Sequence, residues 1–87
     1  MFELLLHQKA SEFFKKIDKH VKERIVNDLK KLKENPQHGK HLKYSNFWSL
    51  RSGDYRSIYE INFKEKRVIV LFIGHRKHVY DDFSKLF

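Results

Sequence analysis

Residues Leu50–Tyr80 have the sequence LRSGDYRSIYEINFKEKRVIVLFIGHRKHVY, and this stretch decides the fold of the chain. The turn residues Ser52-Gly53-Asp54 precede Tyr55–Phe63, in which polar and apolar side chains largely alternate, as in a half-buried strand. Arg67–Ile73 is almost continuously apolar and rich in β-branched residues, which is typical of a central strand buried on both faces. The stretch therefore predicts a hairpin at the centre of a sheet.

The register of this hairpin determines which side chains meet. If Lys64–Lys66 forms a three-residue turn, Arg56 lies opposite Gly74, whose missing side chain leaves room above the sheet for a ligand. Arg76 then lies diagonally from Arg56 on the same face, and such neighbours are about 7–8 Å apart. A turn of two or four residues would reverse this relationship. The other face of the first strand carries residues expected in the core: Tyr55, Tyr59, Ile61 and Phe63.

The segments before the hairpin predict a strand and two helices. Phe2–His7 is short and apolar, as expected for a strand. Asp18 is suited to cap the second helix, and Asn35-Pro36 ends it, because a residue before proline avoids the helical region. The pattern fits either a helical hairpin or one kinked helix. Apolar residues recur at helical spacing in two stripes: Ala10, Phe13, Phe14 and Ile17, then Val21, Ile25, Leu29 and Leu32.

The remaining segments complete the predicted fold. Gln37–Ser45 is a polar, basic loop, Phe47–Arg51 is a short strand whose aromatic residues are expected in the core, and Val79–Phe87 is either a short closing helix or an ordered tail. The order β-α-α-β-β-β predicts an α+β fold, with two N-terminal helices packed on one face of a small, mostly antiparallel sheet. We expect residues 1–87 to form one domain, with the opposite sheet face, which carries Arg56, open for function.

Composition limits the possible partners. The chain has 87 residues, a formal net charge of +8 and an isoelectric point near 9.8, which favours RNA, DNA, an anionic membrane or an acidic protein. The lack of cysteine excludes disulfides and thiolate chemistry, and no segment approaches the roughly 18 apolar residues of a membrane span. The N-terminal residues lack the features of a signal peptide, so we expect a soluble, cytoplasmic protein.

The residues near the hairpin ends suggest phosphate chemistry. Metal-free cleavage of RNA needs a base for the 2′-hydroxyl proton, cations for the crowded phosphorane and an acid for the departing 5′-oxygen. Arg56 and Arg76 could stabilise the charge, since guanidinium groups bind phosphate with two parallel hydrogen bonds. His75, His78 and Tyr80 could transfer protons, and Tyr80 could instead stack on a base.

Simpler interpretations apply to the same residues. Arg56 could be an ordinary exposed strand residue, and Arg76 could pair with Asp81 or Asp82. The lysines of Lys15–Lys33 fit a solvated helix face as well as a nucleic-acid surface. Two His-x-x-His pairs lack supporting ligands, so no metal or other cofactor is expected: His38 and His41, and His75 and His78. These observations alone describe a small basic binding domain.

The paired motifs L-R-x-G-x-Y-R-x-I-Y-E-I, from Leu50, and V-x-V-L-x-I-G-H-R-x-x-V-Y, from Val68, resemble those of the RelE/ParE superfamily of toxins. The resemblance extends from Phe2 to Tyr80. It implies a RelE-like fold and the toxin half of a type II toxin–antitoxin pair, whose expected partner is an acidic antitoxin. RelE-like members cut messenger RNA in the ribosomal A site and leave a 2′,3′-cyclic phosphate, whereas ParE-like members inhibit DNA gyrase.

The resemblance also implies roles for individual residues. Arg56 matches the arginine that contacts the scissile phosphate, Arg76 matches the one that stabilises the transition state, and Tyr80 matches a catalytic or base-stacking tyrosine. His75 occupies a position that is often basic. The expected further contacts with RNA or phosphate come from basic residues: Lys40, Lys43, Arg51 and Lys77.

One departure from the family pattern leaves the general base unassigned. The two lysine positions on the strand before Leu50 hold Phe47 and Ser49. The candidates that could substitute are His75, His78, Lys40 and Lys43. The retained arginines and tyrosine favour a ribosome-dependent endoribonuclease over a gyrase inhibitor, and a non-catalytic RNA-binding module is the third alternative.

Overall fold

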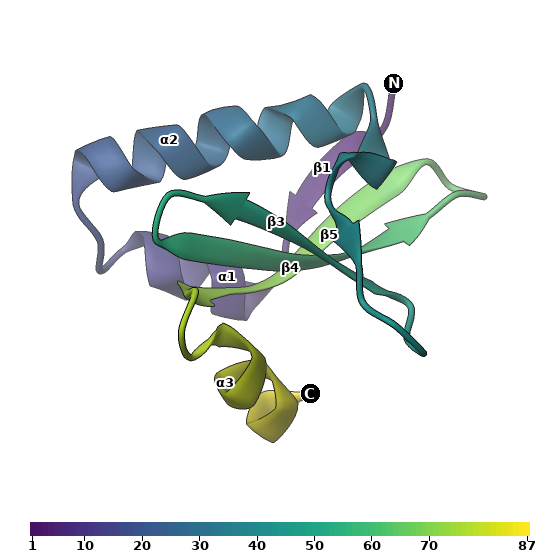
Figure 1. Ribbon diagram of the computed structural model, residues 1–87. Helices are drawn as coiled ribbons and strands as arrows, with labels where there is room; N and C mark the ends of the chain where they lie inside the picture. Colours follow the sequence, from purple (N-terminus) through teal and green to yellow (C-terminus); the bar gives the residue numbers. More distant parts are fainter.

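The computed structural model describes residues 1–87 (Figure 1). The five strands form one sheet in the order β1-β5-β4-β3-β2, in which β1 runs parallel to β5 and the other pairs are antiparallel. The predicted α+β class and the closing helix are confirmed. The elements in chain order are β1 (Glu3–Leu6), α1 (Gln8–Phe14), α2 (Lys19–Lys30), β2 (Lys40–His41), β3 (Phe47–Ser52), β4 (Tyr55–Asn62), β5 (Arg67–His75) and α3 (Val79–Leu86).

Local signals explain where the two N-terminal helices begin. Nδ1 of His7 accepts a hydrogen bond from the backbone N–H of Lys9 at the start of α1, and Oδ1 of Asp18 accepts one from His20 at 2.8 Å at the start of α2. The predicted cap at Asp18 is thus confirmed, and the helices are separate rather than one kinked helix. Two 3-10 turns follow α2, and the chain leaves the α-helical conformation before Pro36, as predicted.

The helices α1 and α2 bury the larger of two cores against one sheet face. Tyr59 is fully buried in it, and Tyr55 and Ile61 pack against it, so the predicted inner face of β4 is confirmed. Phe63 instead lies in the turn after β4 and is 55% exposed, with its ring edge against Phe2. The buried members of this core are Ala10, Phe14, Ile25, Leu29, Leu32, Leu50, Tyr59, Val68, Val70 and Ile73.

The helix α3 packs on the opposite face of the sheet. Its residues Val79 and Phe83 form a second core with Ile58 and Leu71, and Figure 1 shows α2 and α3 on opposite sides of the sheet. The expectation that this whole face is open is therefore wrong. Gly74 is buried, and a Cβ added there would lie 3.4 Å from Val79, so the space predicted for a ligand is filled by the start of α3.

The β4–β5 hairpin has the predicted register at the end that carries Arg56 and Gly74, but its turn is longer than predicted and β5 contains a bulge. The turn contains four residues, because Asn62 pairs with Arg67 and its Oδ1 accepts a hydrogen bond from the backbone of Glu65 at 3.0 Å. A bulge at Leu71 adds one residue to β5 between two successive pairs of the ladder. This shift cancels the error in turn length, so Arg56 pairs with Gly74 as predicted.

The segment predicted as a polar loop contains a short strand. Lys40 and His41 pair with Ser49 and Trp48, which makes β2 an edge strand beside β3. The ring of His41 also contacts that of Trp48, with centroids 4.9 Å apart and the planes tilted by 34°, and Trp48 packs against the larger core as predicted. No helix in the structure has the length and apolar character needed to span a membrane.

Candidate functional site

The hydroxyl of Ser49 joins two of the predicted site residues. Nη1 of Arg56 donates to Oγ of Ser49 at 3.1 Å, and the hydroxyl of Tyr80 donates to the same oxygen at 3.2 Å. We call this group of three residues the serine junction. Ser49 is only 1% exposed, whereas Tyr80 keeps 40% of its surface exposed. The junction therefore fixes the polar ends of an arginine from β4 and a tyrosine from α3 beside each other at the surface.

Three arginines gather at the end of the sheet that contains the β3–β4 turn. Arg51 pairs directly with Arg56 across the strands, and its Nε donates to the carbonyl oxygen of Gly53 at 2.9 Å. Nε of Arg76 lies 3.6 Å from Oδ1 of Asp54, and the backbone N–H of Arg76 donates to the carbonyl of Asp54 at 2.7 Å. Arg76 thus pairs with the turn rather than with the carboxylates of α3. The guanidinium of Arg24 also lies beside Gly53, so one carboxylate accompanies four guanidinium groups and this end of the sheet is positively charged.

The tight β3–β4 turn depends on Gly53. Its φ of +61° lies in the left-handed region, which is the conformation that a primed hairpin turn requires at its first central position. This turn brings Arg51 and Arg56 opposite each other and places Asp54 within reach of Arg76. The conformation of one glycine therefore helps to set the positions of all three arginines.

A hollow adjoins the serine junction on the β2 side. It has a volume of about 430 Å³, and we call it the basic hollow. Lys40 pairs with Ser49 across β2 and β3, so both side chains project from the same face of the sheet. Because Tyr80 belongs both to the hollow and to the junction, the two features are continuous. The residues that line the hollow are Lys40, His41, Leu42, Lys43 and Tyr80.

Tyr59 anchors the chain just before Lys40. Its hydroxyl donates to the carbonyl of Pro36 at 2.8 Å and accepts from the backbone N–H of Gly39 at 3.1 Å. Burial raises the pKa of Tyr59 to about 12, with the Gly39 hydrogen bond acting in the opposite direction. A Cβ added to Gly39 would lie 2.6 Å from both the Ser49 carbonyl oxygen and the Tyr59 hydroxyl, so only glycine fits there. The start of β2 is thus held against the core.

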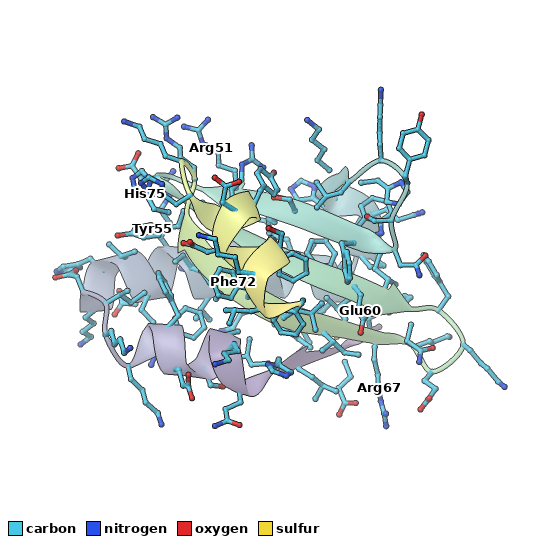
Figure 2. The ribbon with its side chains drawn as sticks, turned by 90° about the horizontal axis from the view of Figure 1, so that it is seen from below. Arg51, Tyr55, Glu60, Arg67, Phe72 and His75 are labelled. Carbon is cyan, nitrogen blue, oxygen red and sulfur yellow. The ribbon has the colours of Figure 1, made fainter.

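His75 lies apart from the serine junction. His75 pairs with Tyr55 and packs edge-on against its ring, on the face of the sheet opposite Arg56. Its Nδ1 accepts a hydrogen bond from the backbone N–H of Lys77 at 3.2 Å, and the ring of His78 lies 6.0 Å from it. Figure 2 shows Arg51, Tyr55 and His75 at the same end of the sheet, far from Arg67 at the other end. The structure therefore brings His75 to the same end as the arginines but not to the same face.

The predicted site residues form two sets. One set belongs to the serine junction and the basic hollow, or pairs with them: Arg56, Tyr80, Lys40, Lys43 and Arg51. The other set belongs to neither feature: Arg76, His75, His78 and Lys77. Ser49 is the residue whose role the sequence did not reveal, because its contact with Tyr80 depends on where α3 docks. The sequence contained two signals: Ser49 occupies a position where the family pattern has a lysine, and it lies on the same face of its strand as Arg51. The whole arrangement is suited to bind an anion such as a phosphate.

The chain is similar to toxins of type II toxin–antitoxin systems. The family model described as "ParE toxin of type II toxin-antitoxin system, parDE" matches residues 4–80, which is most of the chain. No match was found among curated proteins.

Solved structures with the same fold include several toxins and toxin–antitoxin complexes. The isolated RelE toxin of Escherichia coli is 24% identical, with a TM-score of 0.74, and the match covers 99% of this chain and 98% of that chain. The RelBE2 complex of Mycobacterium tuberculosis is 23% identical, with a TM-score of 0.77 and coverages of 86% and 98%. The RelB–RelE antitoxin–toxin complex of Methanococcus jannaschii is 26% identical, with a TM-score of 0.70 and coverages of 91% and 98%.

Proposed function

Since this chain belongs to the ParE toxin family of type II toxin–antitoxin systems, within the RelE/ParE superfamily, we propose that it is a ribosome-dependent endoribonuclease that cleaves messenger RNA in the A site. The observation that carries this proposal is the serine junction. It holds a guanidinium and a phenol side by side, next to a basic hollow open to solvent. A phosphate beside this junction would meet a charge-stabilising group and a proton donor together.

The proposed reaction is a transesterification within RNA. The 2′-oxygen forms a bond to the adjacent phosphorus while the bond from phosphorus to the 5′-oxygen breaks, which leaves a 2′,3′-cyclic phosphate and a 5′-hydroxyl. One proton leaves the 2′-hydroxyl, and one is added to the 5′-oxygen. We assign Arg56 to the non-bridging oxygens of the phosphate and Tyr80 to a hydrogen bond or proton transfer at one of the two ester oxygens.

Arg51 and Arg76 belong to the same proposal. Their guanidinium groups lie at the β3–β4 turn, where they would attract the RNA backbone and add to the positive potential around the developing phosphorane. His75 is half-exposed at the end of β5, and Lys77 and His78 are exposed on the segment just after it; we propose that these three residues contact neighbouring nucleotides.

We further propose an antitoxin as the regulatory partner. The structures of the relatives from Mycobacterium tuberculosis and Methanococcus jannaschii are toxin–antitoxin complexes. The net charge of +8 on this chain fits an acidic partner. An antitoxin that neutralises the arginines at the β3–β4 turn would also block access to the serine junction.

Inhibition of DNA gyrase is the second candidate function, because the matching family model is that of the ParE toxin. In that case toxicity would depend on contacts with gyrase and would be accompanied by DNA damage rather than loss of message. The serine junction would then have a structural role only.

One experiment separates the two functions. The purified chain is incubated with a defined message, with and without programmed ribosomes, and cuts are mapped by primer extension. Cuts that appear only with ribosomes and disappear in Arg56→Ala support the proposal. Intact message with folded wild-type protein, together with loss of gyrase supercoiling activity, would establish the second candidate instead.

A further inference from the structure

The basic hollow is lined by Lys40, whose backbone position is fixed by the fold and whose ammonium group makes no ion pair. Lys40 is exposed, and the ion pairs of the structure join other residues: Lys31 to Asp28, Arg67 to Glu3 and Glu65, and Arg76 to Asp54. Because the backbone at Lys40 is already held by the fold, only its side chain has to become ordered when the ammonium group binds an anion. Such a group is well suited to bind a ligand.

The register places Lys40 beside the serine junction. Residues directly opposite each other in an antiparallel pair have Cβ atoms about 4.5–5.5 Å apart, and Lys40 is directly opposite Ser49. Oγ of Ser49 in turn accepts hydrogen bonds from Arg56 and Tyr80. Lys40 therefore lies on one side of the junction in the same row of the sheet, and its four-carbon side chain has the length to cross the hollow toward Tyr80.

The backbone on the N-terminal side of Lys40 is rigid, which separates it from its neighbour Lys43. Gly39 packs against the Ser49 carbonyl and hydrogen-bonds to the buried Tyr59, so Lys40 projects from a fixed point. Lys43 lies in the loop between β2 and β3, next to Tyr44, which is fully exposed and has a φ of +61°. Both lysines line the hollow, but only Lys40 is part of the sheet.

From this placement we propose that Lys40 is a phosphate-binding residue of the site, supplying from β2 an ammonium group that pairs with the RNA phosphate held by Arg56. The inference rests on the proposed function and adds to it a cation from an edge strand. Its role is ionic: the ammonium group donates a hydrogen bond to a non-bridging oxygen of the phosphate. The hollow beyond it, lined by Leu42 and the exposed side of Tyr80, would then receive the adjoining nucleotide.

Binding without cleavage tests this role directly. The full chain is titrated with a short 2′-O-methyl RNA, which cannot be cut, and the dissociation constant is measured by fluorescence anisotropy at several salt concentrations. Loss of one phosphate contact lowers the slope of log affinity against log salt by about 0.7 for a single strand. We expect this change in Lys40→Ala and not in Lys40→Arg, which keeps the charge.

Lys64→Ala is the matched control, because it removes the same charge from the β4–β5 turn at the other end of the sheet. It should retain the wild-type slope. A wild-type slope in Lys40→Ala, or an equal loss of slope in Lys64→Ala, would overturn the inference. Thermal unfolding of each variant shows that the fold is intact, as expected for changes at exposed side chains.

Cleavage on programmed ribosomes provides the second readout. We expect Lys40→Ala to cut about 10- to 100-fold more slowly than the wild type, as for other losses of a group that stabilises transition-state charge, and Lys40→Arg to retain most of the rate. Equal rates in the wild type and Lys40→Ala would overturn the inference while leaving the proposed function intact. If the wild type cuts no RNA, the proposed function fails and the salt slope alone decides whether Lys40 binds phosphate.

Discussion

Arg56 of β4 and Tyr80 of α3 share one hydrogen-bond acceptor, the hydroxyl of Ser49, at distances of 3.1 and 3.2 Å. A hydroxyl oxygen has two lone pairs, so Ser49 can satisfy both donors at once. The contact joins the last helix to the middle of the sheet on the face where the phosphate is proposed to bind. We expect changes at these residues to affect cleavage, and changes at Gly39 and Tyr59 to affect the stability of the fold.

Ser49→Ala should slow cleavage by about tenfold, because Arg56 and Tyr80 lose the acceptor that positions them, and small displacements of catalytic groups have large effects on rate. The free energy of unfolding should fall by about 1–3 kcal/mol, since two hydrogen bonds of about 0.5–1.5 kcal/mol each are lost. Ser57→Ala is the matched control, since Ser57 is equally buried but faces the α1–α2 core. Wild-type rates in Ser49→Ala would show that the junction does not position the site.

Arg56→Ala should fold normally and lose growth inhibition, with a decrease in cleavage rate of about 100-fold or more, as expected for a group that stabilises developing charge. Arg76→Ala should weaken cleavage as well. Arg67→Ala is the control: Arg67 is an exposed arginine at the far end of the same hairpin, paired with Glu3 and Glu65, and its loss should cost at most about 1 kcal/mol of stability. Retained toxicity in Arg56→Ala would contradict the assignment.

Tyr80→Phe keeps the aromatic ring and removes the hydroxyl that donates to Ser49. Single-turnover cleavage should slow by at least about tenfold, and by about 100-fold if the hydroxyl transfers a proton. Tyr44→Phe tests whether any exposed tyrosine has this effect, because Tyr44 is fully exposed and lies in the same basic region. An unchanged rate in Tyr80→Phe would limit Tyr80 to stacking.

Gly39→Ala should destabilise the fold by about 1–3 kcal/mol, the usual cost of forcing an extra group into a packed site. The added Cβ would displace either the Ser49 carbonyl or the Tyr59 hydroxyl, both of which lie 2.6 Å from its ideal position. Urea unfolding measures this loss. Gly74→Ala is the comparison, because its Cβ would make ordinary 3.4 Å contacts, and it should have a much smaller effect.

The stability of the chain should fall at alkaline pH through Tyr59, whose folded-state pKa is raised to about 12 from an ordinary value of 10.0. The folded state holds the phenolic proton more tightly than the unfolded state, so this contribution is complete below pH 10 and is lost as the pH rises toward 12. The loss is at most about 2.7 kcal/mol, since each pKa unit is worth about 1.4 kcal/mol. Denaturant midpoints of the wild type and Tyr59→Phe should converge between pH 10 and 12. A constant difference between the two proteins across that range would contradict the prediction.

The sequence predicted the fold well where periodicity decides it. The apolar stripes identified both N-terminal helices, Asp18 identified the start of the second helix, and the alternation along Tyr55–Phe63 identified the inner face of β4. The pairing of Arg56 with Gly74 was correct although the turn length was not. Because β5 is apolar on both faces, its sequence has no alternation of polar and apolar residues that a bulge would interrupt. The extra residue at Leu71 was therefore not predicted.

The site was harder to predict because it depends on docking between elements that are distant in sequence. Two-residue strands such as β2 have no period of their own, so the alignment of Lys40 with Ser49 emerges only from the sheet. The sequence left Val79–Phe87 as a short helix or an ordered tail, and it gave no indication of the face of the sheet on which this segment packs. Ser49 stood out in the sequence only as a departure from the family pattern, and only the positions of Arg56 and Tyr80 reveal what it contacts.

The parallel pairing of β1 with β5 has a consequence for the way this chain is made. Glu3 lies beside Arg67, so the first strand to leave the ribosome stays without its partner until more than sixty further residues have been added. Arg76 and Tyr80 are synthesised later still. Until β5 has been synthesised, no strand lies between β1 and β4, and the groups proposed to act on RNA are not yet assembled. The order of synthesis therefore places the assembly of this sheet, and of the site proposed on it, after Tyr80 has been added to the chain.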